Sequence, residues 1–296
     1  MIKDLYPFIQ AYALIIGLAV GSFLNVIIYR LPHNKSIVRP RSKCTGCGTQ
    51  IAWYDNIPVL SYILILGKCR NCKAAISIRY PLIELICGLM TITLLSIYGL
   101  SLEFIVIVLL CYMLIAITFI DVDHFIIPNE FIIFGLGISI IAHAFKLLPI
   151  SILEGVYGIL AFGGTLFIMG AIGTWAFRKE ALGFGDIKLG LVLGSFLGTE
   201  LSLLALFLSF IFAAFMSIIL LLAKEVGEDH MIPFGPSIAA GTLLTILTKT
   251  VGGGNHIINW YFTNMWTGEY FFYWLSHEKR ILAGCLLRQE YLSLNS

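Results

Sequence analysis

Two short sequences place aspartates directly beside long apolar segments, where ionisable groups are costly and usually functional. The first, Asp121-Val-Asp123-His124, follows an apolar run, and the second, a Gly-Phe-Gly-Asp sequence ending at Asp186, precedes one. Two carboxylates brought together share a proton, because both cannot easily ionise at close range. One can then act as a base on water while the other donates a proton to a carbonyl. This pairing favours peptide hydrolysis without a covalent intermediate.

Residue type alone leaves several interpretations of these sequences open. Asp123 and His124 compete with Asp121 for the same role, and all of these groups could be interfacial side chains solvated by water. Gly183 and Gly185 favour the functional interpretation, because glycine lets a backbone or an extended substrate approach closely.

Four of the seven cysteines form two Cys-x-x-Cys pairs with 21 residues between them. Two such pairs can converge on one tetrahedral ion through thiolate ligands, and a four-cysteine site has no open position for water. We therefore expect structural Zn²⁺; redox-active pairs are the alternative. Cys87 and Cys111 lie in apolar segments and are expected to be packing residues. The predicted zinc ligands are Cys44, Cys47, Cys69 and Cys72.

The composition predicts that lipid surrounds most of the chain. Hydrophobic residues make up 59% and charged residues 12%, against about 25% charged in soluble domains, and mean hydropathy is +0.93. A helical crossing needs about 20 apolar residues. We expect an all-α polytopic membrane protein with about eight transmembrane helices. The predicted spans are 8–29, 81–99, 102–120, 126–145, 152–175, 186–199, 201–223 and 235–251.

The order of these spans predicts four parts. The break between the sixth and seventh spans rests only on Gly198, Thr199 and Glu200. The last part is dense in aromatic residues, which is typical of a membrane interface. The parts are the first transmembrane helix (1–29), a small four-cysteine zinc loop (30–80), a transmembrane peptidase domain (81–251) and an aromatic C-terminal tail of unknown role (252–296).

The placement of basic residues predicts the orientation of the chain. Nine of the nineteen Lys and Arg residues lie between Arg30 and Arg79. Such a patch could bind nucleic acid, but beside apolar spans it is more typical of a cytoplasmic loop. With this loop in the cytoplasm, thirteen basic residues fall on the cytoplasmic side and three on the other. We therefore expect lipid and no nucleic acid as partner, with both aspartates facing the cytoplasm.

Taken in order, the motifs resemble those of type IV prepilin peptidases, bifunctional leader peptidases and N-methyltransferases of type IV pilus and type II secretion systems. The resemblance covers roughly residues 10 to 250. A lone Gly-x-Gly-Asp is weak, since it also occurs in presenilin-like proteases, but the ordered set is specific. The set comprises Gly21-Ser-Phe-Leu-Asn25 with Tyr29-Arg30-Leu-Pro32, the four cysteines, Arg79-Tyr80-Pro81 with Glu84, Asp121-Val-Asp123-His124 with Ile127-Pro128-Asn129, Gly183 to Lys188, and Ile232-Pro233-Phe234-Gly235-Pro236.

The resemblance implies a catalytic pair, substrates and a location. It assigns the two catalytic aspartates to Asp121 and Asp186. It implies prepilin or pseudopilin substrates, cut after a glycine on the cytoplasmic side of the bacterial inner membrane. The new amino terminus would then be methylated with S-adenosylmethionine as the donor.

The donor site is less visible, because no glycine signature of a dinucleotide-binding fold precedes a strand. By resemblance it involves the cytoplasmic loop and its flanks. Arg30 and Arg79 could instead be ordinary membrane-interface anchors. Residues 266–296 match no part of the family pattern. The candidate donor-binding residues are Asn25, Arg30, Arg79 and Glu84.

Two other classes of function compete with the enzyme. A proton- or cation-coupled transporter could use Asp121, Asp123 and Asp186, but transporters tend to place such groups near mid-bilayer in duplicated halves. A membrane-anchored zinc scaffold would explain the cysteines and leave both aspartate motifs unused.

Overall fold

The computed structural model describes residues 2–222, 233–249, 254–261 and 263. It divides into two compact units, Met1–Leu247 and Thr248–Ser296. Within the second unit, the described residues include one short helix, α10 (His256–Tyr261). The aromatic residues predicted to form an interfacial belt beyond position 263 lie outside the described residues.

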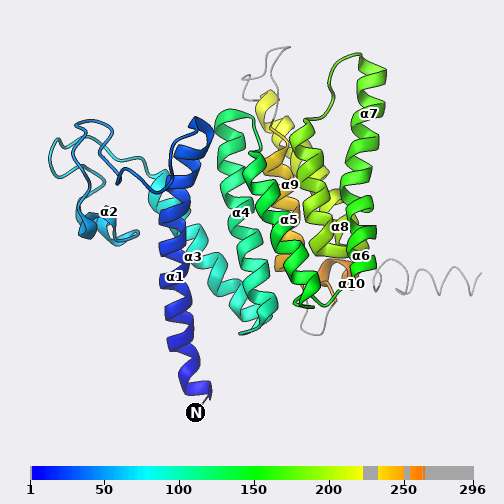
Figure 1. Cartoon of the computed structure of the whole chain (residues 1–296), viewed down its shortest axis with the longest axis horizontal. Helices are drawn as coiled ribbons and strands as arrows, with labels where there is room; N and C mark the ends of the chain where they lie inside the picture. Colours follow the sequence, from blue (N-terminus) through cyan, green and yellow to red (C-terminus); the bar gives the residue numbers. More distant parts are fainter. Residues whose placement is uncertain (1, 223–232, 250–253, 262, 264–296) are drawn as a thin grey trace, which may run out of the picture. The chain divides into compact units, whose positions relative to one another are not determined.

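Long apolar helices build the first unit (Figure 1). Between the described residues only isolated β-bridges form, so the predicted all-α class is confirmed. Short η1 (Leu31–His33) and η2 (Trp53–Asn56) lie in the cysteine loop, and η3 (Leu160–Gly164) is a π-helical segment. The helices are α1 (Ile2–Arg30), α2 (Leu60–Leu64), α3 (Arg79–Tyr98), α4 (Leu102–His124), α5 (Asn129–Ala144), α6 (Ile152–Ile159), α7 (Thr165–Phe177), α8 (Phe184–Leu222) and α9 (Gly235–Leu247).

Five of these segments are long and apolar enough to cross a membrane. They correspond to α1, α3, α4, the continuous run from α6 to α7, and α8, while α5 and α9 are shorter apolar helices. The chain is therefore a multi-pass membrane protein, and the count of eight crossings stays a prediction.

Local sequence explains where several helices begin. The Ser101 side chain accepts a hydrogen bond from Phe104 N at 3.0 Å and caps α4. Ser151 and Glu154 form a reciprocal capping box at the start of α6. Pro128 stands in extended conformation immediately before α5. Side-chain acceptors at the starts of α4 and α6 satisfy amides that have no partner inside the helix.

A kink at Gly198 divides α8. This residue has φ 71° and ψ −176°, which an α-helix does not contain and which a side chain would strain. The helix is therefore interrupted at the predicted position, while the division of this run into two membrane spans stays a prediction. The long apolar helix α8 is thus divided into two helical segments by the kink.

The prediction for the end of the third span was wrong by one turn. Helix α4 continues past residue 120 to His124, so Asp121 lies in its last turn rather than after it. The helix ends where Phe125 adopts φ 56° and donates its amide to Asp121 O at 2.9 Å. The sequence contains no proline or glycine between Leu102 and that point that would end the helix earlier.

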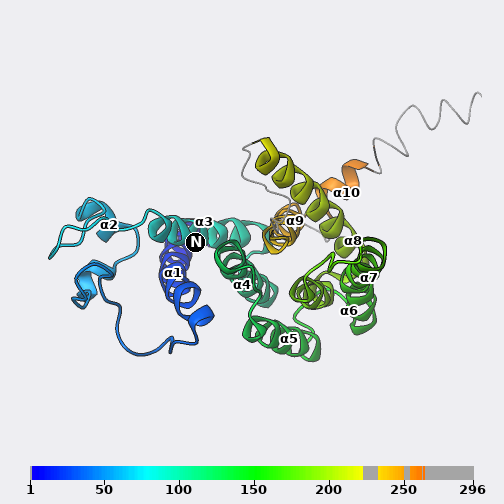
Figure 2. The ribbon, with the colours of Figure 1, turned by 90° about the horizontal axis from the view of Figure 1, so that it is seen from above.

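Helix α9 lies between α4 and the long helix α8, and contacts both (Figure 2). The ends of α1 and α4 and the starts of α3, α5, α8 and α9 lie on the upper side of Figure 1, with the cysteine loop. Both aspartate motifs are thereby placed at the same end of the helices.

Helices α1 and α3 cross closely because glycines line their contact. A Cβ on Gly17 would lie 2.8 Å from Cys87 O and 2.8 Å from Gly88 Cα, both backbone atoms that cannot swing away.

We expect Gly17→Ala to lower the free energy of unfolding by about 1–3 kcal/mol, because the added methyl overpacks the α1–α3 contact. Thermal unfolding of the detergent-solubilised protein measures this. Gly137→Ala is the matched control, because a Cβ there meets no atom within 4 Å. Equal unfolding temperatures for the two variants would contradict the close crossing.

Candidate active site

Asp121 is withdrawn from solvent at the end of α4. The residue is 5% exposed, and its Oδ2 accepts a hydrogen bond from the Gly235 amide at 3.1 Å. Gly235 is the first residue of α9, so this donor is one of the free amides at a helix start, which favour a negative charge. A Cβ on Gly235 would lie 2.6 Å from the same oxygen. Only glycine allows this approach.

Asp186 lies in a similar setting in the first turn of α8. It is 8% exposed, and its carboxyl group interacts with the backbone of Gly183. A Cβ on Gly183 would lie 2.9 Å from Asp186 Oδ2. Each aspartate is therefore held against a glycine backbone near a helix start.

Three contacts bring the two aspartate motifs together. The position of a Cβ on Gly185 lies 3.2 Å from Ile127 Cβ, in the turn after α4. Lys188 Nζ donates to Asn129 Oδ1 at 3.0 Å, which joins the starts of α8 and α5. The Asp121 carboxyl also acts electrostatically on Asp186. The structure thus brings together two motifs whose aspartates are 65 residues apart in the sequence.

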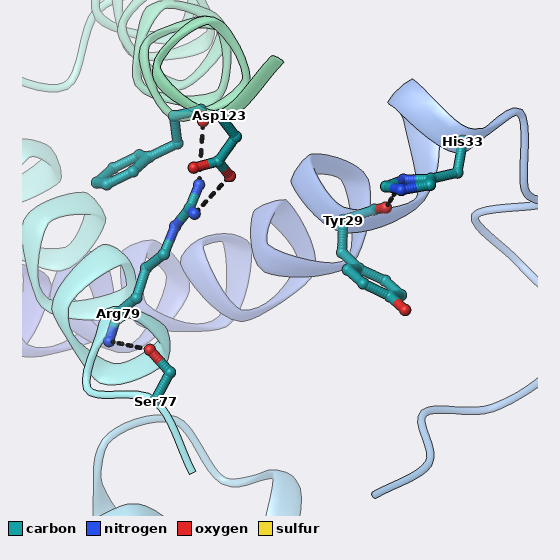
Figure 3. Close-up of polar contacts among 6 residues, drawn as sticks. Tyr29, His33, Ser77, Arg79 and Asp123 are labelled. Atoms are coloured by element: carbon teal, nitrogen blue, oxygen red, sulfur yellow. Dashed lines mark hydrogen bonds and ion pairs between the residues drawn. The ribbon is translucent and has the colours of Figure 1, made fainter. Parts of the chain in front are cut away.

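Asp123 is engaged elsewhere (Figure 3). Its Oδ2 lies 2.5 Å from Arg79 Nη1, and the two side chains are 34% and 32% exposed. Arg79 Nη2 also donates to Phe119 O at 3.1 Å. His124 makes an edge-to-face contact with His33 at 5.3 Å between ring centroids. The alternatives to Asp121 therefore have partners away from the buried carboxyl.

The four loop cysteines form one cluster. Their Sγ atoms all lie within 4.8 Å of one another, and Cys44 Sγ is 3.7 Å from Cys72 Sγ. Four thiolates around a tetrahedral ion with bonds of about 2.3 Å would be about 3.8 Å apart. The cluster could therefore hold one metal ion.

Each Cys-x-x-Cys pair sits in the same kind of turn. Lys43 bridges Gln50 around the first pair, and Lys68 bridges Ala75 around the second, seven positions apart in both cases. In each turn the first cysteine's amide donates to a carbonyl five residues on, at 2.9 Å. The two turns therefore present their sulfur atoms alike, as a shared tetrahedral site requires.

A hydrogen bond with the Thr49 side chain, together with one from its backbone, lowers the pKa of Cys47 to about 6. In the same cluster a backbone hydrogen bond with Ala74 lowers the pKa of Cys72, but burial and hydrogen bonds with the other three thiols outweigh it and raise that pKa to about 11.

The four candidate donor-binding residues are occupied within the protein. Asn25 Nδ2 donates to Gly21 O and Tyr80 O at 3.2 and 3.1 Å. Glu84, which is buried, accepts from the Val59 amide at 2.7 Å. Both side chains stabilise the packing of α1, α3 and the loop.

The arginines of that set are likewise engaged. Arg30 donates to Ser36 O and Pro40 O at 2.9 and 2.8 Å, and Arg79 binds the end of α4. Arg30 alone of the four lines a cavity of about 270 Å³ between α1 and the cysteine loop. The hydrogen-bonding groups of these four side chains are therefore used within the protein and do not present a free set that fits a methyl donor.

Sequence reasoning gave no role to two residues that this site uses. Gly235 stands in the last of the family-like motifs, but its hydrogen bond joins positions 114 residues apart. Lys188 follows Asp186 by two residues, yet its partner Asn129 lies on another helix. Both residues lie in the family-like motifs, and this was the one sequence feature that could have pointed to them.

We expect the purified chain to carry one metal ion, bound by the cysteine cluster. Cys44→Ser should lose most of it, because three thiolates remain for a four-coordinate site. Elemental analysis of the detergent-purified protein measures this, with Cys87→Ser as a control, since Cys87 is buried in α3. Full metal content in Cys44→Ser would contradict the site.

Two family models match the chain. The model described as the bacterial peptidase A24 N-terminal domain matches residues 15–98. The model described as the type IV leader peptidase family matches residues 108–218. No solved structure matches.

Several curated proteins are similar to this chain, among them three that are each described as a prepilin leader peptidase/N-methyltransferase. One from Myxococcus xanthus is 39% identical over 217 residues, covering 73% of this chain and 64% of the relative. One from Pseudomonas putida is 33% identical over 264 residues, covering 79% and 89%. One from Aeromonas hydrophila is 33% identical over 278 residues, covering 84% and 92%.

The first of these matches spans less than two thirds of its relative, whereas the other two span most of theirs. The family model for the leader peptidases includes both Asp121 and Asp186, and the N-terminal model includes the four cysteines. On this similarity, the chain belongs to the type IV leader peptidase family.

Proposed function

We propose that the chain is a membrane-embedded aspartic endopeptidase in which Asp121 and Asp186 are the catalytic pair. The observation that carries the proposal is the burial of both carboxyl groups at the same end of the helices, each against a glycine backbone, with an electrostatic effect of Asp121 on Asp186. Family membership favours this activity over the transporter considered from the sequence.

The chemistry follows from the pairing. Two carboxyl groups at short range hold one proton between them, and they titrate as a unit. The ionised member accepts a proton from water as that water attacks the scissile carbonyl. The protonated member donates to the carbonyl oxygen. As the tetrahedral intermediate collapses, the carboxyl that took the proton from water gives it to the departing nitrogen, and the other carboxylate takes back the proton from the hydroxyl group, so that the new amine and a carboxylic acid are released. Withdrawal from bulk water strengthens these interactions.

The substrates are prepilins or pseudopilins, as the relatives' names suggest. Cleavage after glycine leaves the apolar helix of the substrate in the bilayer. The positive-inside distribution supports an orientation in the bacterial inner membrane with the site facing the cytoplasm, and the surrounding lipid is the chain's other partner.

The cysteine loop holds structural Zn²⁺, since four thiolates leave no open position for chemistry. The names of the relatives also support N-methyl transfer from S-adenosylmethionine to the new amino terminus.

We expect Asp121→Asn and Asp186→Asn each to abolish cleavage. An amide can neither share a proton with the remaining carboxyl group nor act as a base on water, so each variant loses one half of the catalytic pair. Mass spectrometry of a prepilin incubated with purified protein and S-adenosylmethionine measures removal of the leader and addition of one methyl. Asp123→Asn should still cleave measurably. Cleavage by either Asp121→Asn or Asp186→Asn would refute the pair.

We also expect Gly235→Ala to reduce the cleavage rate by about 100-fold, because its methyl would displace the Asp121 carboxyl, and misplacement by about 1 Å can have that effect. Single-turnover cleavage measures this. Gly137→Ala is the control, since its methyl meets no atom. A normal rate in Gly235→Ala would show that catalysis does not depend on this position of Asp121.

A further inference from the structure

Arg79 contacts the helix end that carries Asp121 in three ways. Its Nη1 pairs with Asp123 Oδ2 at 2.5 Å, its Nη2 donates to Phe119 O at 3.1 Å, and its guanidinium lies 4.9 Å from the Phe119 ring centre (Figure 3). A cation is favoured at the negative end of a helix dipole. A residue of α3 therefore holds the last turn of α4 through three contacts.

The contacts of Arg79 lie on the face of α4 opposite Asp121. Phe119 and Asp123 are four residues apart and share one helix face. Asp121 stands two residues from each, which turns it by about 200° around the helix. On that other side its carboxyl meets the Gly235 amide. Arg79 thus holds one side of the turn while α9 contacts the other.

We propose that Arg79 is a positioning residue for the peptidase reaction, acting through Asp123 and the Phe119 carbonyl to set the place of Asp121. It is the first residue of α3 and belongs to the segment matched by the N-terminal family model, whereas its partners belong to the leader peptidase segment. The N-terminal segment therefore completes the geometry of the peptidase site. This inference rests on the proposed function.

Arg79 is not placed to act directly on the buried pair. Its two terminal nitrogens are used by Asp123 and Phe119 O, which lie on the face of α4 opposite Asp121. A change at Arg79 should therefore act on the reaction by displacing the Asp121 carboxyl.

The test measures single-turnover cleavage of a prepilin over a range of enzyme concentrations. Arg79→Ala should lower the maximal rate by about 10- to 100-fold, as expected for a misplaced catalytic group, with half-saturation within about threefold of wild type. Arg79→Lys should recover part of the rate, because it keeps the contact with Asp123 and loses the fork to Phe119 O. Lys146→Ala, which removes an exposed cation beyond α5, should match wild type.

A double variant tests the route of the effect. Arg79→Ala and Gly235→Ala both displace the Asp121 carboxyl, so their combined loss should be smaller than the product of the separate losses. Metal content and thermal unfolding of each variant report whether it is folded.

Three results would overturn the inference. The first is a maximal cleavage rate equal to wild type in a folded Arg79→Ala protein. The second is a change in Arg79→Ala that affects only the enzyme concentration at half-saturation. The third is a double variant whose rate loss equals the product of the two separate losses. Asp121→Asn in the same assay separates the two claims. An active Asp121→Asn refutes the proposed function, whereas an inactive Asp121→Asn with an unaffected Arg79→Ala refutes only the role of Arg79.

Discussion

Two carboxyl groups withdrawn from water at helix ends impose the main constraint on this structure. A buried carboxyl needs hydrogen-bond donors, since removing an ionised group from water without them costs several kcal/mol. The Gly235 amide provides one for Asp121, and the backbone of Gly183 meets Asp186. A side chain on either glycine would occupy the space of the carboxyl oxygen. A glycine backbone therefore meets each of the two carboxyl groups.

The helix arrangement follows from this need. The start of α9 must reach the end of α4, and the start of α8 must stand beside the turn after α4. Gly198 bends the long α8 run so that α9 can pack between α4 and α8. On the other side, the crossing of α1 and α3 places Arg79 against the last turn of α4. Residues of α3, α8 and α9 thus meet at the end of α4 and the turn that follows it.

Local features were predictable, and non-local pairings were not. Apolar runs predicted the helices, Gly198 predicted an interruption of the long helix, and the cysteine spacing predicted a cluster that could hold a metal ion, because each depends mainly on local sequence. Composition could not show that α4 continues through Asp121, nor choose between Asp121 and Asp123; the choice rested on family resemblance. The structure adds a physical reason, since Asp123 is paired with Arg79. That pair joins positions 44 residues apart, and the Gly235 contact joins positions 114 apart.

The most direct test of the central claim is an experimental structure of the Asp186→Asn variant with an uncleaved prepilin bound in a lipid bilayer mimic. We predict that the scissile glycine carbonyl lies between positions 121 and 186, with its carbon within about 3.5 Å of a water held by the pair. We further predict that the Gly235 amide still binds Asp121. A scissile bond seated against Asp123 and His124, or far from position 186, would contradict the account.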